Sequence, residues 1–260
     1  SGYSVSLSAD GSIVAIGAVF NSVKVPYSGH VRVYKYNDIT SWVQEGKDID
    51  GEPDEDESGY SVSLSADGSI VAIGAKYNDG NDENGEIIRN SGHVRVYQRD
   101  SNSVNNTDDT SDNFGPEGWK RLGGDIDGED AGDESGKSVS LSADGSIVAI
   151  GANYNGGNGN FSGHVRIYKY GPEGWIRLGE DIDGEYAGDE SGKSVSLSAD
   201  GSIVAIGSTY NSNRGHVRVY KYSGASWTQI GADIDGESVG GASGWSVSLS
   251  ADGSIVAIGA

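Results

Sequence analysis

The sequence predicts an all-β protein, a β-propeller built from four-stranded antiparallel blades. The main observation is internal repetition, because the 14-residue string SVSLSADGSIVAIG occurs five times without change. The copies span residues 4–17, 61–74, 138–151, 194–207 and 246–259. Counted from the Ser-Gly before each copy, the complete repeats are 52 to 77 residues long. This length and the lack of helical periodicity are typical of propeller blades and do not suit ankyrin or leucine-rich units.

The repeats divide the chain into one predicted propeller domain over residues 1–260. Four units are complete, and a fifth contains the first two strands of a blade. The units span residues 1–57, 58–134, 135–190, 191–242 and 243–260. The chain has no methionine and begins at Ser1, so we expect it to be part of a longer chain. Alternatively, the unfinished unit leaves a strand edge that pairs with another molecule.

The first two strands of each unit lie in the repeated 14-residue string. In Ser4-Val5-Ser6-Leu7-Ser8 the apolar residues alternate with serines, which predicts a strand with one apolar face and one face of small side chains. Such small side chains allow another strand to approach closely. The run Ile13 to Ala18 is apolar on both faces, as in a strand covered on both sides. Asp10-Gly11 between them predicts a tight hairpin.

The third and fourth strands follow after a loop of variable length. Residues Gly29 to Tyr36 alternate and are rich in β-branched and aromatic side chains, which predicts the third strand. The fourth strand begins at a tryptophan and ends before an acidic turn, Asp-Ile-Asp-Gly-Glu. No stretch of the sequence predicts a helix.

The composition excludes several classes of protein. The formal net charge is −21, which would repel phosphate backbones, so we expect no nucleic-acid binding. The chain has no cysteine, which excludes disulfides, thiolate metal sites and cysteine nucleophiles. Its longest apolar runs are far too short to cross a bilayer as a helix, so we expect no membrane insertion of this segment.

The succession Ser-Gly-x-Ser-Val, a turn, Ile-Val-Ala-Ile-Gly-Ala and Gly-His-Val-Arg-Val-Tyr resembles the FG-GAP repeat of integrin α-type β-propellers. The resemblance covers nearly the whole chain and implies a propeller with an extracellular adhesive role. Two departures stand out: serine replaces the aromatic residue before the glycine, and the turn between the first two strands is too short for the family's calcium loop. Ser-Ala-Asp-Gly also resembles WD40-like repeats, a second family of the same architecture.

All histidines of the chain occupy one repeat position at the start of the third strand. They are His30, His93, His164 and His216. Ligands of one metal ion must lie within about 2–2.5 Å of it, whereas equivalent positions on different blades lie much farther apart. We therefore interpret the histidines as structural residues, with a metal or anion site as the alternative.

The acidic turn is the best candidate for metal binding. Alternating carboxylates around a glycine supply the hard oxygen ligands that Ca²⁺ prefers. The candidate ligands are Asp48, Asp50, Glu52, Asp56, Asp125, Asp127, Glu129, Asp133, Asp181, Asp183, Glu185 and Asp189. The fourth unit repeats the turn as Asp233, Asp235 and Glu237 but has Gly241 in place of the last aspartate. The alternative is a structural turn whose aspartates accept backbone hydrogen bonds.

Other recurring residues have structural interpretations. We expect the tryptophan of each fourth strand to pack between blades, rather than to form a platform for sugars, and Trp245 to be exposed. The arginine of each third strand is expected to pair with an acidic neighbour. Asn105 and Asn160 begin Asn-x-Ser/Thr sequons, which are glycosylated if the protein enters a eukaryotic secretory route.

Taken together, these patterns predict a non-enzymatic extracellular module of a surface protein or filament, with a structural or adhesive role. We expect protein or glycan partners at the blade loops, and further copies of the chain or flanking repeats as additional partners. No catalytic residues are identified. No cofactor is expected to be required, with bound Ca²⁺ as the alternative. The alternatives are a calcium-dependent carbohydrate-binding propeller and a propeller hydrolase or lyase acting on polysaccharide.

Overall fold

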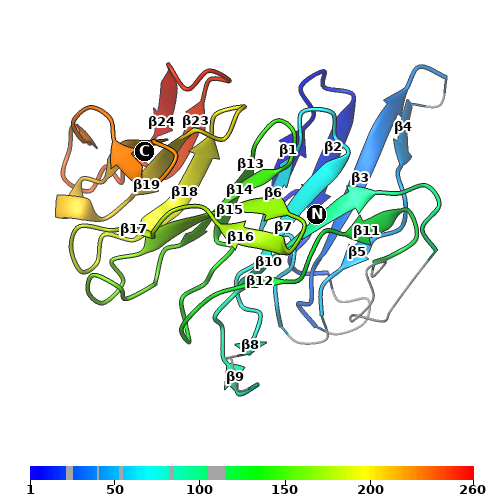
Figure 1. Cartoon of the computed structure of the whole chain (residues 1–260), viewed down its shortest axis with the longest axis horizontal. Coiled ribbons are helices and arrows are strands. Elements are labelled where there is room, and N and C mark those ends of the chain that lie inside the picture. Colours follow the sequence, from blue (N-terminus) through cyan, green and yellow to red (C-terminus); the bar gives the residue numbers. More distant parts are fainter. Residues whose placement is uncertain (22–25, 40, 53–54, 82–84, 105–114) are drawn as a thin grey trace.

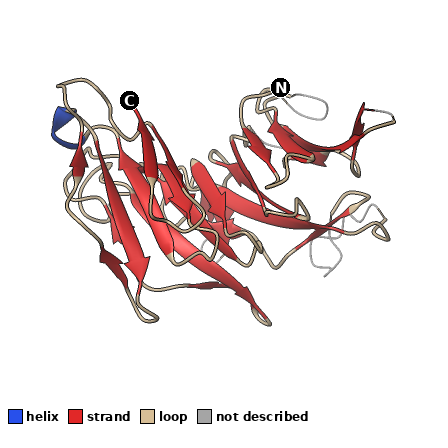
Figure 2. Cartoon of the chain, turned by 90° about the horizontal axis from the view of Figure 1, so that it is seen from above, coloured by secondary structure: helices blue, strands red, loops and turns tan. Residues whose placement is uncertain are grey.

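The computed structural model describes residues 1–260 except 22–25, 40, 53–54, 82–84 and 105–114. The described residues fold into β-strands and contain no α-helix; one short 3₁₀ turn covers Asn211–Asn213 (Figure 2). The predicted all-β class is therefore confirmed. None of the described segments forms a helix long and apolar enough to span a membrane.

Each of the first four units forms one five-stranded sheet, and the fifth unit forms a hairpin (Figure 1). The first sheet contains β1 (Val5–Leu7), β2 (Ile13–Gly17), β3 (His30–Asn37), β4 (Ser41–Gln44) and β5 (Ile49–Asp50). The second contains β6 (Ser61–Leu64), β7 (Ile70–Ala75), β10 (His93–Arg99), β11 (Trp119–Arg121) and β12 (Ile126–Asp127). The third contains β13 (Ser138–Leu141), β14 (Ile147–Ala152), β15 (His164–Gly171), β16 (Gly174–Arg177) and β17 (Ile182–Asp183). The fourth contains β18 (Ser191–Leu197), β19 (Ile203–Ser208), β20 (His216–Tyr222), β21 (Trp227–Gln229) and β22 (Ile234–Asp235). The last hairpin is β23 (Ser246–Leu249) and β24 (Val256–Gly259), and a further small hairpin, β8 (Gly80–Asn81) and β9 (Ile87–Ile88), extends from the second unit.

The strands of each sheet are antiparallel and follow the chain order predicted from the sequence. One segment differs from the prediction. The Ile-Asp of the expected acidic turn forms a short strand, β5 in the first sheet, which pairs with the beginning of β3 while β4 pairs with its end. Ile49 is buried, so its apolar side chain holds this segment against the sheet. The fourth strand is therefore interrupted and resumed, and the turn prediction is wrong for these two residues.

The sheets follow one another in chain order and form an open arc (Figure 2). Apolar side chains fill the space between successive sheets. The first of these cores contains Ile13, Ala15, Val31, Val33 and Ile49 from the first sheet and Val62, Leu64, Val71, Ile73, Tyr97 and Trp119 from the second. Equivalent residues form two more cores farther along the arc. Since each core lies between two units, a unit depends on its neighbours for burial of its apolar surface.

The first strands of neighbouring units are joined by a repeated set of hydrogen bonds. Ser4 Oγ donates to the carbonyl of Gly59 at 2.7 Å, and the amide of Leu64 donates to Ser6 Oγ at 2.9 Å. The same two bonds recur at the next three junctions. The serine face predicted for close approach is thus the face that meets the next unit.

The glycine at the end of each second strand permits this approach. A Cβ atom placed on Gly17 would lie 2.1 Å from the carbonyl oxygen of Gly59. The same contact would be 2.2 Å at Gly74, 2.1 Å at Gly151 and 2.0 Å at Gly207. Any side chain at these positions would therefore force neighbouring sheets apart.

The Ala-Asp-Gly segments form the predicted tight turns. Asp10 accepts hydrogen bonds from the amide and the hydroxyl of Ser12 and from the hydroxyl of Ser8, and Gly11 has a positive φ of 71°. These bonds, above all the one from the Ser12 amide, lower the pKa of Asp10 to about 2. The turn thus holds a charged carboxylate at neutral pH.

Replacement of Gly74 by alanine tests the close approach between sheets. We expect Gly74→Ala to lower the free energy of unfolding by about 1–3 kcal/mol, because the added methyl group would overlap the carbonyl of Gly136. The measurement is chemical denaturation. Gly124→Ala is the matched control, since a Cβ at Gly124 meets no atom within 4 Å and its φ is not positive. Equal effects of the two variants would contradict the proposed constraint.

Candidate functional site

The four histidines occupy the first position of the third strand in every sheet. They begin β3, β10, β15 and β20, and all four are buried. In the first sheet, His30 pairs with Asp50 of the short strand β5. This pairing brings each histidine to the acidic segment of its own unit, which lies well apart from it in the sequence.

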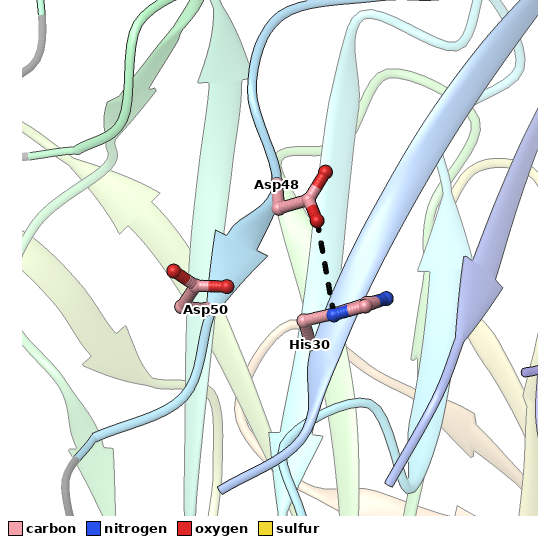
Figure 3. Close-up of side chains that lie close together, drawn as sticks. All are labelled: His30, Asp48 and Asp50. Carbon is pink, nitrogen blue, oxygen red and sulfur yellow. Dashed lines mark ion pairs between the residues drawn. The ribbon is translucent and has the colours of Figure 1, made fainter. Parts of the chain in front are cut away.

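Each histidine ring faces a carboxylate of that segment, and Figure 3 shows this arrangement for His30 and Asp48. Nδ1 of His30 lies 3.8 Å from Oδ2 of Asp48, and the matching distances in the other units are 3.6 to 3.9 Å. These distances are too long for hydrogen bonds. Burial lowers the pKa of His93 and His164 to about 4, so both rings are neutral at pH 7. The histidines therefore do not form ion pairs at neutral pH.

In the first three units, an arginine two residues farther along the third strand binds the same aspartate. Arg32 donates to both carboxylate oxygens of Asp48 at 2.7 to 3.0 Å. Its hydrogen bonds hold the pKa of Asp48 below the usual range. Arg95 and Arg166 bind their own aspartates in the same bidentate manner. The predicted pairing of this arginine with an acidic neighbour is confirmed.

The acidic segments of the first three units also reach the next sheet. Glu52 of the first unit pairs with Arg95 of the second, which at the same time binds Asp125. Asn78 donates to the other carboxylate oxygen of Glu52 at 2.9 Å. The equivalent pairs at the later junctions are Arg166 with Glu129 and Arg218 with Glu185. A charged contact thus accompanies the serine contacts at each of these junctions.

The four predicted calcium ligands of one unit therefore have different interaction partners. Asp48 binds Arg32, Asp50 lies beside His30, and Glu52 pairs with the next sheet. Asp56 is buried and accepts a hydrogen bond from the amide of Glu52 at 2.9 Å. In the next two units, Asp133 accepts a hydrogen bond from the amide of Asp130, and Asp189 accepts one from the amide of Tyr186. Calcium binding stays a prediction, and these contacts describe what a calcium ion would compete with.

The structure instead groups histidine nitrogens with carboxylate oxygens. In each group the potential ligand atoms lie within 4.8 Å of one another. The groups are His30, Asp48 and Asp50; His93, Asp125 and Asp127; Glu129, His164 and Asp181; and Glu185, His216 and Asp233. Mixed nitrogen and oxygen donors are typical of Zn²⁺, whereas Ca²⁺ takes oxygen ligands. The sequence pattern shows the histidines and the acidic segments as separate repeat positions, and the pairing of the third strand with the short Ile-Asp strand brings them together.

A row of aromatic and lysine side chains lies at the beginning of the first strands, at the end of the sheets where the histidines lie. It occupies one repeat position, namely Tyr3, Tyr60, Lys137, Lys193 and Trp245. The rings of Tyr3 and Tyr60 are 4.9 Å apart, and Nζ of Lys137 lies 4.8 Å from the centre of the Tyr60 ring. Nζ of Lys193 lies 4.8 Å from the ring of Trp245. Tyr3 and Trp245 are exposed, as predicted for Trp245.

A cavity of about 420 Å³ lies beside this row in the first unit. Its lining includes Tyr3, Phe20, His30 and Arg32. In the second unit the equivalent arginine, Arg95, is contacted by Glu52 of the preceding unit. The cavity therefore lies where a preceding acidic segment would dock.

Three of the four tryptophans of the fourth strands pack between sheets, as predicted. Trp119 is fully buried, and its Nε1 donates to the carbonyl of Glu45 in the preceding unit. Trp175 and Trp227 make the same bond to the carbonyls of Leu122 and Leu178. Trp42 lies in the first sheet and is exposed.

The structure describes one of the two predicted glycosylation sequons. Asn160 is exposed in the loop between β14 and β15. Asn105 lies outside the described residues.

Comparison with known proteins adds no relative: neither protein-family models nor curated proteins match the chain. The resemblance to FG-GAP repeats therefore rests on the sequence motifs.

Asp56 tests the electrostatics of the acidic segment. Burial raises its pKa to about 7 from an ordinary value of 3.8, so between these values the folded protein binds more protons than the unfolded chain. This contribution lowers stability as pH rises from about 4 to 7, by up to about 1.4 kcal/mol for each pKa unit. We expect Asp56→Asn to gain stability relative to the unmodified chain between pH 5 and 8, measured by urea unfolding in chelator-treated buffer.

Asp48→Asn is the control with the opposite expected pH dependence, because Arg32 lowers the pKa of Asp48. This variant should lose stability at pH 7, and the loss should shrink as the pH falls below 4. A pH-independent effect of Asp56→Asn would contradict the assignment of a raised pKa.

Proposed function

We propose that this protein is a non-enzymatic extracellular structural or adhesion module, built as a β-propeller of the FG-GAP type. Three features support the propeller: strand order within the units, packing of successive sheets face to face, and the first strands lying together along the arc. The sequence resemblance supports the FG-GAP assignment and, through that family, an extracellular location.

The roles of the recurring polar side chains support a scaffold rather than an enzyme. Serines, arginines and glutamates that repeat from unit to unit make contacts between the sheets. An active site needs unlike groups that converge in one pocket. The repeated groups of this chain are distributed one set per unit, which suits a scaffold.

The loops of variable sequence and several exposed aromatic rings lie at the same end of the sheets. This observation is the main support for a binding role. The loops between second and third strands differ in every unit and start beside the aromatic–lysine row. Tyr77, Phe161 and Tyr210 in these loops are exposed. Exposed aromatic side chains contribute much of the binding energy where proteins recognise protein or sugar partners.

Binding at this end is tested with variants that leave the cores intact. We expect the chain to bind defined oligosaccharides or purified extracellular proteins on an array, and the double variant Tyr3→Ala, Trp245→Ala to lose at least tenfold in affinity. Tyr36→Ala is the matched control, since Tyr36 is exposed on β3 near the opposite end. Equal binding by all three proteins, or turnover of a polysaccharide, would contradict the proposal.

Calcium-dependent carbohydrate binding is the second candidate function. The carboxylate oxygens of the grouped residues are ligands that Ca²⁺ takes. The Nδ1 atoms of His30, His93 and His216, which lack hydrogen-bond partners among the described residues, favour Zn²⁺ instead. The arginines bound to the aspartates of the first three units oppose cation binding there.

We expect the thermal midpoint to be unchanged by EDTA, because Arg32, Arg95 and Arg166 already neutralise the aspartates of the first three units. The measurement is thermal unfolding with EDTA, with added Ca²⁺ and with added Zn²⁺. A midpoint that rises with one cation and falls with EDTA would assign a structural metal to the acidic segments.

A further inference from the structure

The histidine of the fourth unit differs from the others in its hydrogen bonding. His216 begins β20 and is fully buried, with an exposed fraction of 0%. Neither Nδ1 nor Nε2 of its ring has a hydrogen-bond partner among the described residues. Such a ring is uncommon, because buried polar side chains are normally hydrogen-bonded. Histidine is also the side chain that most often binds metal ions, through one nitrogen of a neutral ring.

Two carboxylates lie beside this ring. Nδ1 of His216 lies 3.6 Å from Oδ2 of Asp233, which is the shortest of the four histidine–aspartate distances. Glu185 of the third unit completes the group, whose potential ligand atoms all lie within 4.8 Å of one another. Two ligands of one tetrahedral Zn²⁺ ion stand about 3.3 Å apart, because each bond is about 2.0–2.1 Å long. Nδ1 and Oδ2 are therefore already close to the separation of two zinc ligands.

The aspartate of this group is not bound by the arginine of its own third strand. In the first three units that arginine holds the equivalent aspartate in two hydrogen bonds or more. The pairs are Arg32 with Asp48, Arg95 with Asp125 and Arg166 with Asp181.

The fourth unit uses its arginine differently. Nη2 of Arg218 donates to the carbonyl of Asp183 in the third unit at 2.9 Å. Among the described residues, the donor to Asp233 is Gln229, whose Nε2 lies 2.7 Å from Oδ1. This bond orients the carboxylate, as outer partners of metal ligands do, and leaves Oδ2 as the oxygen near His216.

The glutamate of the group is also held less tightly than its equivalents. Nη1 of Arg218 lies 3.7 Å from Oε1 of Glu185, beyond hydrogen-bond range, whereas arginine and glutamate are in direct contact at the two preceding junctions. Asn78 donates to Glu52 in the second unit, but Nδ2 of the equivalent Asn211 has no partner among the described residues. Glu185 can therefore turn toward an ion without losing such a bond.

Charge and access suit a cation. The carboxylates of Glu185 and Asp233 outnumber the one guanidinium nearby, that of Arg218, in a chain with a formal net charge of −21. Their side chains are 35% and 29% exposed, so an ion can reach them from solvent although the histidine is buried.

Both sheets of this junction are complete in the chain. Glu185 follows β17 of the third sheet, and His216 and Asp233 belong to the fourth. The side chain of Asp233 is 29% exposed, close to the 26% of Asp48 in the first unit, which a complete second unit follows. The group is therefore formed by the third and fourth units alone.

We propose that one Zn²⁺ ion binds between the third and fourth units, ligated by Nδ1 of His216, Oδ2 of Asp233 and a carboxylate oxygen of Glu185. The fourth position of the tetrahedron is open to solvent. The ion joins the two sheets where an arginine joins them at the preceding junctions. Since arginines hold the aspartates of the other three units, the chain binds one ion and not four. The site is separate from the proposed partner-binding end.

Zinc titration tests the stoichiometry and the ligands. The protein is treated with EDTA, freed of it and titrated calorimetrically in excess Ca²⁺, which occupies sites made of oxygen ligands alone. We expect one Zn²⁺ per chain, and a thermal midpoint about 5 °C higher at a Zn²⁺ concentration about 100 times Kd. This rise is measured against protein without added metal, whose midpoint EDTA leaves unchanged.

The ligand variants are Asp233→Asn and Glu185→Gln, each expected to weaken zinc binding by about tenfold or more. Both side chains are partly exposed, so the variants should fold, which circular dichroism checks. Asp48→Asn is the matched control, since Arg32 holds this aspartate, and it should keep the affinity of the unmodified chain. Absence of zinc binding, or equal affinity in Asp233→Asn and the unmodified chain, would overturn the proposal.

Gln229→Arg tests whether an arginine at the aspartate excludes the ion. Arg121 and Arg177 occupy the equivalent position in the second and third units and bind the aspartate there, so the fold accommodates arginine. We expect Gln229→Arg to weaken zinc binding by at least tenfold. Gln44→Arg, the same change in the first unit, should leave it unaltered. Unchanged affinity in Gln229→Arg would contradict the assignment of Asp233 as a ligand.

Long-range proton–nitrogen NMR of the unmodified chain identifies the ligating ring without any variant. The chain has four histidines, so each imidazole gives a separate set of signals. We expect Zn²⁺ to shift the Nδ1 signal of His216 and to leave the other three rings unchanged. Equal shifts at all four rings, or no shift at any, would overturn the site. A chain that binds zinc here but no partner on the array refutes the adhesive role alone.

Discussion

The close approach of neighbouring units at the end of the second strand is the constraint on which the structure depends. A carbonyl oxygen of one unit lies where a Cβ of the preceding unit would stand, as at Gly17 and Gly59. This distance allows a serine hydroxyl to reach the next backbone and brings apolar residues of both sheets into one core. Since burial occurs between units, stability is a property of pairs of units rather than of single sheets.

The same approach organises the charge of a strongly acidic chain. Part of the acidic excess lies in the acidic segments, where an arginine lies between the aspartate of its own unit and the glutamate of the preceding one, as Arg95 lies between Asp125 and Glu52. A buried arginine between two carboxylates offsets their mutual repulsion. Removal of either acid would leave the arginine with an incomplete set of partners, so charge and packing support the same junction.

Local patterns were sufficient to predict most of the strands. Alternation in residues 4–8 predicted both faces of the first strand, and Asp10-Gly11 predicted its turn. The pattern was insufficient for Ile49-Asp50, where the acidic composition favoured a turn but burial of one isoleucine produced a strand. The candidate site was predicted in part: the acidic residues were identified, but their distribution among arginine, histidine and backbone partners was not.

The sequence by itself determined the unit boundaries, the strand order and the face that each serine and valine occupies, because these follow from a repeated local pattern. The tertiary structure decided which residues of different units meet. Glu52 and Arg95, or Trp119 and the carbonyl of Glu45, are far apart in the chain and come together through the packing of sheets. It also decided that identical strings differ in exposure at the two ends of the arc, since burial depends on a neighbour and not on the string itself.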